Sequence, residues 1–333
     1  MMRSIDGSID WEIWIAGQSD PVVAQQYLEH ALSSEYAVLI EPSLSEGFIG
    51  MDYEWRAPAQ ITNAVVDIDR SSVWGPSQVQ ALRSVQCHYV QFRILERVKD
   101  LKVVEILNSF DRSHVDHIQL LLPGSYTDDR DWMQTLLDQY PRLNSIRVYG
   151  VPQTGERYSD AIMRPIIWMG AFLDEYGPAK ERMVITMTLF CESQEHHNYF
   201  NRKLYIAKDG AIGNAPESTG HYGNMNEIRD GREMIDIVER PEFQKYWRVS
   251  KKMIDVCKEC EFRYMCMDNR LPESRSPETW FHEKECPYNP YICKWKGEEG
   301  YRTLAECGVV SNAEGFSIDH ERIAAINAEL WGE

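Results

Sequence analysis

The sequence has no long hydrophobic run and no excess of positive charge. No stretch approaches the roughly 18 uninterrupted apolar residues of a membrane-spanning helix, and residues 1–17 lack the charged-then-apolar pattern of a signal peptide. Acidic residues outnumber basic ones by 52 to 35, which leaves a net charge of −17. Such a charge repels the phosphates of nucleic acids and anionic lipids. We therefore expect a cytoplasmic protein that binds neither nucleic acid nor a membrane.

The motifs of several common enzyme classes are also missing. There is no Gly-x-Ser-x-Gly elbow and no His-Glu-x-x-His run, so nothing indicates a serine hydrolase or a zinc protease. A phosphate-binding loop is not indicated either, because residues 45–50 (SEGFIG) lack its lysine and its spacing. His196 and His197 are adjacent, and adjacent side chains diverge on a helix or a strand. We interpret these two histidines as part of a solvated loop.

Between residues 86 and 190, short β-rich runs alternate with helical patterns. The runs recur roughly every 30 residues, as expected for β-α units that build a parallel sheet. Four such units make an open parallel sheet or an incomplete, partial TIM-like β/α barrel, since closure takes about eight. The chain is therefore of the α/β class. The predicted strands are residues 86–95, 115–122, 142–150 and 182–190, and the predicted helices are residues 100–110, 129–140 and 159–177.

The chain divides into three parts by pattern. Residues 1–80 are predicted to form a small α/β unit, and residues 81–200 the partial barrel. Residues 201–333 begin with a predicted β-hairpin that turns at Asp209-Gly210, since Asp-Gly supplies the positive dihedral angles of a tight turn. A helix over residues 232–253 should be interrupted at Pro241, and residues 320–331 are predicted to form a closing helix. The intervening residues 268–300 show little periodicity, so we expect this part to need a covalent or metal staple.

Four of the eight cysteines show the spacing of a metal site. Cys257, Cys260 and Cys266 form a Cys-x2-Cys-x5-Cys run, and Cys286 follows with a proline directly after it. In a reducing cytosol, disulfides are disfavoured. Two thiolates two residues apart can bind one centre from a single turn, and two later thiolates complete the sulfur coordination that suits zinc or an iron-sulfur cluster. We predict a four-cysteine metal or iron-sulfur site, with Cys293 as an alternative fourth ligand.

The segment around these cysteines resembles a SPASM domain, the iron-sulfur extension of radical-SAM peptide-modifying enzymes. The runs DVCKECEFRYMCMDNR and NRKLYIAKDGAIGNAP are most similar to the SPASM protein of grasp-with-spasm systems. HIQLLLPG and YPRLNSIRVYG resemble strands of the family's half-barrel, so the likeness covers about residues 86–295. It implies a peptide maturase-like protein that acts with an ATP-grasp ligase to mature a ribosomally synthesised, post-translationally modified peptide (RiPP).

The resemblance also implies which cofactor these cysteines hold. SPASM domains commonly contain two auxiliary 4Fe-4S clusters, and the ligand positions of one correspond to Cys257, Cys260, Cys266 and Cys286. The other cluster would need cysteines where this chain has Ala215 and Arg270. We therefore expect one 4Fe-4S cluster, with zinc as the alternative. Cys191 is either a remnant of the missing site or a buried structural thiol.

A radical-SAM core needs a Cys-x3-Cys-x2-Cys run, and the only cysteine before Cys191 is Cys87. Radical-SAM chemistry is therefore not supported, and we expect no S-adenosylmethionine. The resemblance implies that the protein binds the precursor peptide or presents it to a partner ATP-grasp ligase. Two alternatives remain: a redox or Lewis-acid iron-sulfur enzyme that acts on the peptide itself, and a structural zinc-binding protein.

Overall fold

The computed structural model describes residues 55–152, 154–158, 164–170, 183, 186–312 and 315–332. These residues belong to a compact unit, Trp55–Glu333. Most of the α/β unit predicted over residues 1–80 lies outside the described residues. Among the described helices, none has the length and apolar character needed to cross a membrane.

The largest sheet that the structure describes is mostly parallel and has eight strands, in the order β5-β6-β4-β3-β2-β1-β7-β8. β5 and β8 are the two edges, and each pairs antiparallel with its neighbour, whereas the other pairs are parallel. The predicted α/β class and parallel sheet are thus confirmed. The strands are β1 Asn63–Ile68, β2 Tyr89–Ile94, β3 His117–Pro123, β4 Leu143–Tyr149, β5 Gly155–Tyr158, β6 Pro165–Met169, β7 Lys203–Ile206 and β8 Ile212–Gly213.

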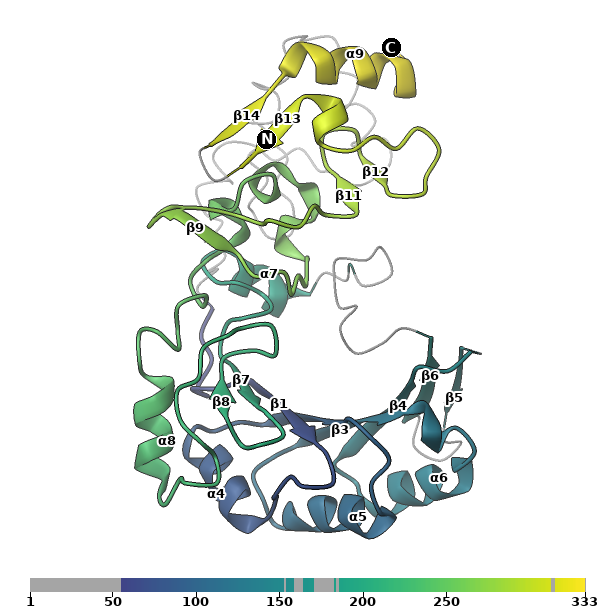
Figure 1. Ribbon diagram of the computed structural model, residues 1–333, viewed down its shortest axis with the longest axis vertical. Coiled ribbons are helices and arrows are strands. Elements are labelled where there is room, and N and C mark those ends of the chain that lie inside the picture. The colour runs from purple at the N-terminus through teal and green to yellow at the C-terminus, as the bar shows by residue number, and fades with distance from the viewer. Residues whose placement is uncertain are drawn as a thin grey trace, which may run out of the picture. The chain divides into compact units, whose positions relative to one another are not determined.

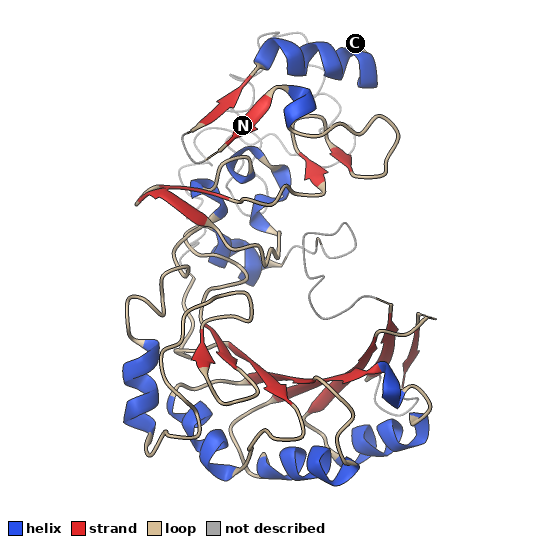
Figure 2. Ribbon diagram, in the orientation of Figure 1, coloured by secondary structure: helices blue, strands red, loops and turns tan. Residues whose placement is uncertain are grey.

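The two faces of the sheet differ because alternate residues of a strand point to opposite sides. Val66, Phe92, Leu120 and Ile146 are in register across β1 to β4, and all are fully buried. They pack in one apolar core with residues of the helices α4 (Pro76–Ser84), α5 (Asp100–Ser109) and α6 (Arg130–Gln139). Figure 2 shows these helices together on one side of the sheet.

The opposite face of the sheet carries polar side chains. Arg93 on β2 forms a bidentate ion pair with Asp67 on β1, at 2.5 and 2.7 Å. In the next row, Gln119 donates to Ser145 at 2.8 Å. A parallel sheet covered by helices on both faces would be apolar on both. These polar side chains therefore fit a sheet that helices cover on one face only. The sheet includes β1, although the sequence pattern assigned residues 1–80 to a separate unit.

Two predicted elements between β4 and β7 are wrong. Residues 159–177 were predicted as a helix, but Pro165–Met169 form β6, which pairs in parallel with β4. Proline lacks the amide hydrogen that a helix interior needs, and the Ile-Ile-Trp that follows favours a strand. Residues 182–190 were predicted as a strand, but Met187–Ser193 form the helix α7, in which Thr186 caps Leu189 N–H at 3.1 Å. The other residues of the predicted helix, 159–163 and 171–177, lie outside the described part.

Beyond β8 the elements are short. The predicted hairpin is present as β7 and β8 with Gly210 at φ +89°, and the next helix, α8, ends at Val238, before Pro241. The second half of the predicted helix over residues 232–253 is wrong, because turns and the 3-10 turn Lys251–Met253 follow Pro241. Isolated turns and two-stranded pairs then follow, and the predicted last helix is α9. Figure 1 labels these elements except β10. Their bounds are α8 Gly231–Val238, β9 Glu273–Ser276, β10 Thr279–Phe281, β11 Tyr288–Asn289, β12 Lys294–Trp295, β13 Val309–Ser311, β14 Phe316–Ile318 and α9 His320–Trp331.

Candidate metal centre

The four cysteines of the predicted site line one small cavity. Cys257, Cys260, Cys266 and Cys286 all contribute to it, and its volume is about 30 Å³. Such a space admits a single water molecule or ion before any side chain moves. The structure therefore brings together four thiols that are spread over 30 positions of the sequence.

Consecutive tight turns direct the first three thiols toward this cavity. Residues Cys257–Glu259 and Glu261–Tyr264 form two 3-10 turns, and Cys260 lies between them. The amide of Cys260 donates to Cys257 O at 3.1 Å, and the amide of Arg263 donates to Cys260 O at 3.2 Å. Short turns of this kind bring cysteines two residues apart to the same side of the chain. Cys286 joins from a separate loop, where Tyr288 N–H donates to its Sγ at 3.4 Å.

The four thiols are spaced more widely than the ligands of one tetrahedral ion. Around zinc, the sulfur atoms would be roughly 3.8 Å apart, because the Zn–S bond is about 2.3 Å. No three of the four Sγ atoms, all of which lie in the described part of the chain, come within 4.8 Å of one another.

The thiols differ in how readily they lose a proton. Burial raises the pKa of Cys260 to about 12, and it also raises the pKa of Cys266 and of Cys286. Burial acts the same way on Cys257, but the positive charge of Lys251 and a hydrogen bond from His282 outweigh it and lower that pKa to about 7. Cys257 is therefore the first of the four to become a thiolate.

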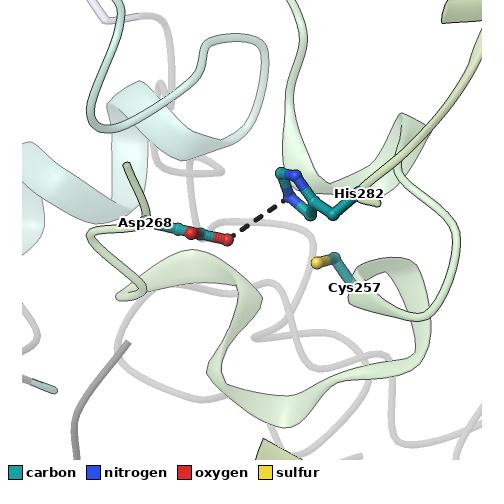
Figure 3. A group of neighbouring side chains, drawn as sticks. All are labelled: Cys257, Asp268 and His282. Carbon is teal, nitrogen blue, oxygen red and sulfur yellow. Dashed lines mark ion pairs between the residues drawn. The ribbon is translucent and has the colours of Figure 1, made fainter. Parts of the chain in front are cut away.

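A buried carboxylate holds the charged groups beside the thiols. Asp268 is fully buried, and one of its oxygens accepts from Lys251 Nζ at 2.6 Å and from Arg270 Nη2 at 2.7 Å. The other oxygen accepts from Arg270 Nε at 2.9 Å. Figure 3 shows His282 on the same carboxylate, with Nε2 at 3.3 Å, and Cys257 beside it. Asp268 thereby keeps two cations next to the cysteine cavity.

Cys257, Asp268 and His282 also have the residue types of a metal site, with their ligand atoms within 4.8 Å of one another. The surroundings argue against an ion at this point. The carboxylate already accepts from Lys251 and Arg270, and a divalent ion there would be repelled by both. We interpret this group as an ionic support for the four thiols.

No family model, curated protein or solved structure matches the chain. Its function must therefore be argued from these side chains and from the motifs of the sequence.

The structure places the other candidate residues outside the cavity, except Arg270. Cys293 is exposed, and its Sγ contacts Pro290 O at 3.8 Å. Cys191 is part of α7 and is half-buried. Ala215 is completely buried, and Arg270 lines the cavity but offers a guanidinium instead of a thiol.

The interpretation of His196 and His197 as a solvated loop is wrong for His197, whereas His196 lies in a loop and is half-buried. His197 is completely buried. Its amide donates to Trp247 O at 3.0 Å, and its ring packs against Phe200 with the ring centroids 4.7 Å apart. Neither histidine lines the cysteine cavity. Our sequence analysis also missed Lys251, Asp268 and His282, and no spacing rule in the sequence connects them to the cysteines.

Proposed function

We propose that this chain holds one 4Fe-4S cluster through Cys257, Cys260, Cys266 and Cys286. We further propose that it serves in the maturation of a ribosomally synthesised peptide, by binding the precursor or presenting it to an ATP-grasp ligase. The observation that carries the first part is the convergence of four distant cysteines on one cavity. The second part rests on the resemblance of the cysteine run and the hairpin to the SPASM protein of grasp-with-spasm systems.

The donor set fits an iron-sulfur cluster. Four soft thiols are its usual ligands, and Cys257, Cys260, Cys266 and Cys286 supply that number around one cavity. Lys251 and Arg270 would offset part of the negative charge of four thiolates. When bound, such a cluster supplies electron transfer or a Lewis-acidic iron.

The remaining residues of the site position and shield the thiols. Asp268 fixes Lys251 beside Cys257, and the Tyr288 amide holds the Sγ of Cys286. The ring of Tyr288 contacts Phe262 edge-to-face and lies tilted against Trp295, with the ring centroids 4.9 Å apart in both pairs. Phe262 and Tyr288 line the cavity, so these aromatic rings limit the access of water to the sulfur atoms.

The deciding experiment is iron and sulfide analysis of anaerobically purified protein, with an absorption spectrum. We expect about four irons and four sulfides per chain, and their loss in Cys260→Ala. Cys293→Ser is the matched control, since it removes an exposed thiol outside the cavity. If Cys286→Ser retains iron and Cys293→Ser loses it, Cys293 is the fourth ligand and Cys286 is not. A chain without metal would refute the proposal.

The approach of Cys257, Asp268 and His282 favours a second candidate, a structural zinc site. One zinc per chain and no sulfide would establish it. If zinc is lost in Asp268→Asn as well as in Cys257→Ser, the ion lies between these residues and our interpretation of the ionic support is wrong.

The peptide part needs its own test. Genes for an ATP-grasp ligase and a short precursor peptide are sought beside the gene for this chain. The purified products are then mixed with the chain, and binding is measured before and after mild oxidation. Binding that survives oxidation supports presentation of the peptide. Turnover that stops when iron is lost would instead indicate an iron-sulfur enzyme, and no binding of either partner would refute this part.

A further inference from the structure

A second cavity, of about 480 Å³, lies apart from the cysteines at the amino-terminal ends of β1 and β7. Gln60 precedes β1 and Arg202 precedes β7, and the Thr62 amide joins the two segments by donating to Arg202 O at 2.8 Å. Trp247 and Arg248 complete the lining from the turns after α8. The volume lies in the range of small-ligand pockets.

The cavity is cationic in a protein of net charge −17. Arg202, Lys245 and Arg248 line it, with Glu239 as the one carboxylate among its lining residues in the described chain. None of the three cations forms an ion pair with any carboxylate that the structure describes. Arg202 Nη1 donates instead to the carbonyls of Ala57 and Ala59. The charges of Lys245 and Arg248 therefore remain available to an anionic group.

The lining also contains buried polar atoms without partners in the described structure: Gln60 Oε1, Asn201 Oδ1, His196 Nδ1 and Trp247 Nε1. The two amides have a defined orientation. Asn201 Nδ2 donates to Glu192 at 2.8 Å, and Gln60 Nε2 donates to Glu239 at 3.1 Å, so the oxygen of each amide is the unpaired atom. Asn201 and Trp247 are 2% and 9% exposed, and leaving such buried polar groups unpaired costs free energy that hydrogen bonds to a bound ligand would recover.

We propose that this cavity binds a segment of an acidic peptide. The carboxylates of the segment pair with Lys245 and Arg248, its backbone N–H groups donate to the oxygens of Gln60 and Asn201, and Trp247 Nε1–H donates to one of its carbonyls. At neutral pH inorganic phosphate carries only one or two O–H donors beside its acceptor oxygens, so it matches the two amide oxygens less well than a peptide backbone does. The inference rests on the proposed function, in which the acidic peptide is the precursor.

The probe is a short fluorescein-labelled peptide of glutamate and glycine, compared with the same peptide in which every glutamate is glutamine. Anisotropy is measured at low salt with the full chain. We expect the acidic peptide to bind and the neutral one not to. The double variant Lys245→Gln/Arg248→Gln replaces two exposed side chains and should weaken binding of the acidic peptide about tenfold. Lys99→Gln/Arg112→Gln removes the same charge from exposed positions outside the cavity and should leave binding unchanged.

Equal binding of the two peptides, no binding, or an equal loss in the control variant would overturn the proposal. So would displacement of the peptide by inorganic phosphate at a similar concentration, because it would indicate a simple anion site. The cavity contains no cysteine, so peptide binding is measured on protein with and without iron. Anaerobically purified protein that binds the acidic peptide but proves to contain no iron would keep this inference and refute the cluster. Iron-loaded protein that does not bind the acidic peptide would refute this inference and keep the cluster.

Discussion

At the scale of single residues, Asp268 is the carboxylate that binds the charged groups around the proposed metal centre. It is the acceptor for Lys251, Arg270 and His282, although the carboxylate has no exposure to water. Burial opposes its charge, but Lys251 and Arg270 reverse this effect and hold the pKa of Asp268 well below its usual value of 3.8. It therefore stays ionised, and its loss would leave two neighbouring cations uncompensated.

We expect Asp268→Asn to lower the free energy of unfolding by roughly 3–5 kcal/mol, as for other buried pairs that lose one partner. Urea denaturation of the apo chain measures this. The matched control is Asp116→Asn, which breaks an ion pair with His88 at 2.8 Å between exposed side chains. That change should cost less than about 1 kcal/mol. Similar losses in both variants would mean that Asp268 is not a structural charge.

Glu192 should make stability depend on pH. Burial raises its pKa from 4.5 to about 7, with the hydrogen bond from Asn201 opposing this rise. The folded protein then holds a proton that the unfolded chain releases between about pH 4.5 and 7, so the contribution of Glu192 to stability falls as pH rises through this window.

Glu192→Gln should therefore increase the free energy of unfolding at pH 7.5 by up to about 3 kcal/mol, since each pH unit is worth about 1.4 kcal/mol. At pH 4.5 the difference should vanish. Urea titrations at both values test this, with the exposed neighbour Glu195→Gln as the control. An equal effect of Glu192→Gln at both pH values would contradict the raised pKa.

At the scale of elements, local chemistry explains where helices begin. Asp230 precedes α8 and accepts from the amides of Arg232 and Glu233 at 2.8 and 3.1 Å. Its partners are otherwise unpaired amides of the first helical turn. α8 then packs on α4 and adds Met234, Ile237 and Val238 to the core of the sheet.

Asp230→Ala should destabilise the protein by about 1 kcal/mol, because it leaves these amides without an acceptor. Asp230→Asn should cost less, since asparagine caps helices about as well. Thermal unfolding of both variants distinguishes the cap from the charge. A loss of equal size in the two would indicate that the negative charge of Asp230 stabilises the helix, and not its hydrogen bonds.

At the scale of the whole molecule, the apolar cores are unequal. One large core joins the sheet to α4, α5, α6 and α8. The described residues from Val249 onward, which we call the cysteine segment, form only small apolar clusters, such as the one around Ile292, Cys307, Val309 and Ile326. Short two-stranded pairs are marginal by themselves. We therefore expect the cysteine segment to depend on the proposed metal centre more than the sheet does.

Loss of the metal in Cys260→Ala should raise amide hydrogen exchange across residues 254–295 and leave β1 to β4 protected. Exchange followed by mass spectrometry resolves the two regions, and Cys293→Ser serves as the control. Uniform loss of protection would show that both regions unfold as one unit. Unchanged protection in the cysteine segment would show that it needs no centre.

Local patterns in the sequence were sufficient for several features. The alternation of β-rich and helical runs predicted β2, β3, β4, α5 and α6, Asp-Gly predicted the hairpin turn, and residues 320–331 predicted α9 with its observed bounds. The spacing of the cysteines selected the four thiols that line one cavity. These features depend on periodicity, turn chemistry or spacing, all of which are properties of neighbouring residues.

Only the tertiary structure decided the rest. It paired residues 165–169 with β4, buried His197, and brought Lys251, Asp268 and His282 to Cys257. No local pattern encodes these contacts, because they join segments whose approach depends on the packing between them. The sequence by itself therefore determined which residues could bind a metal, and the fold decided which charges surround them.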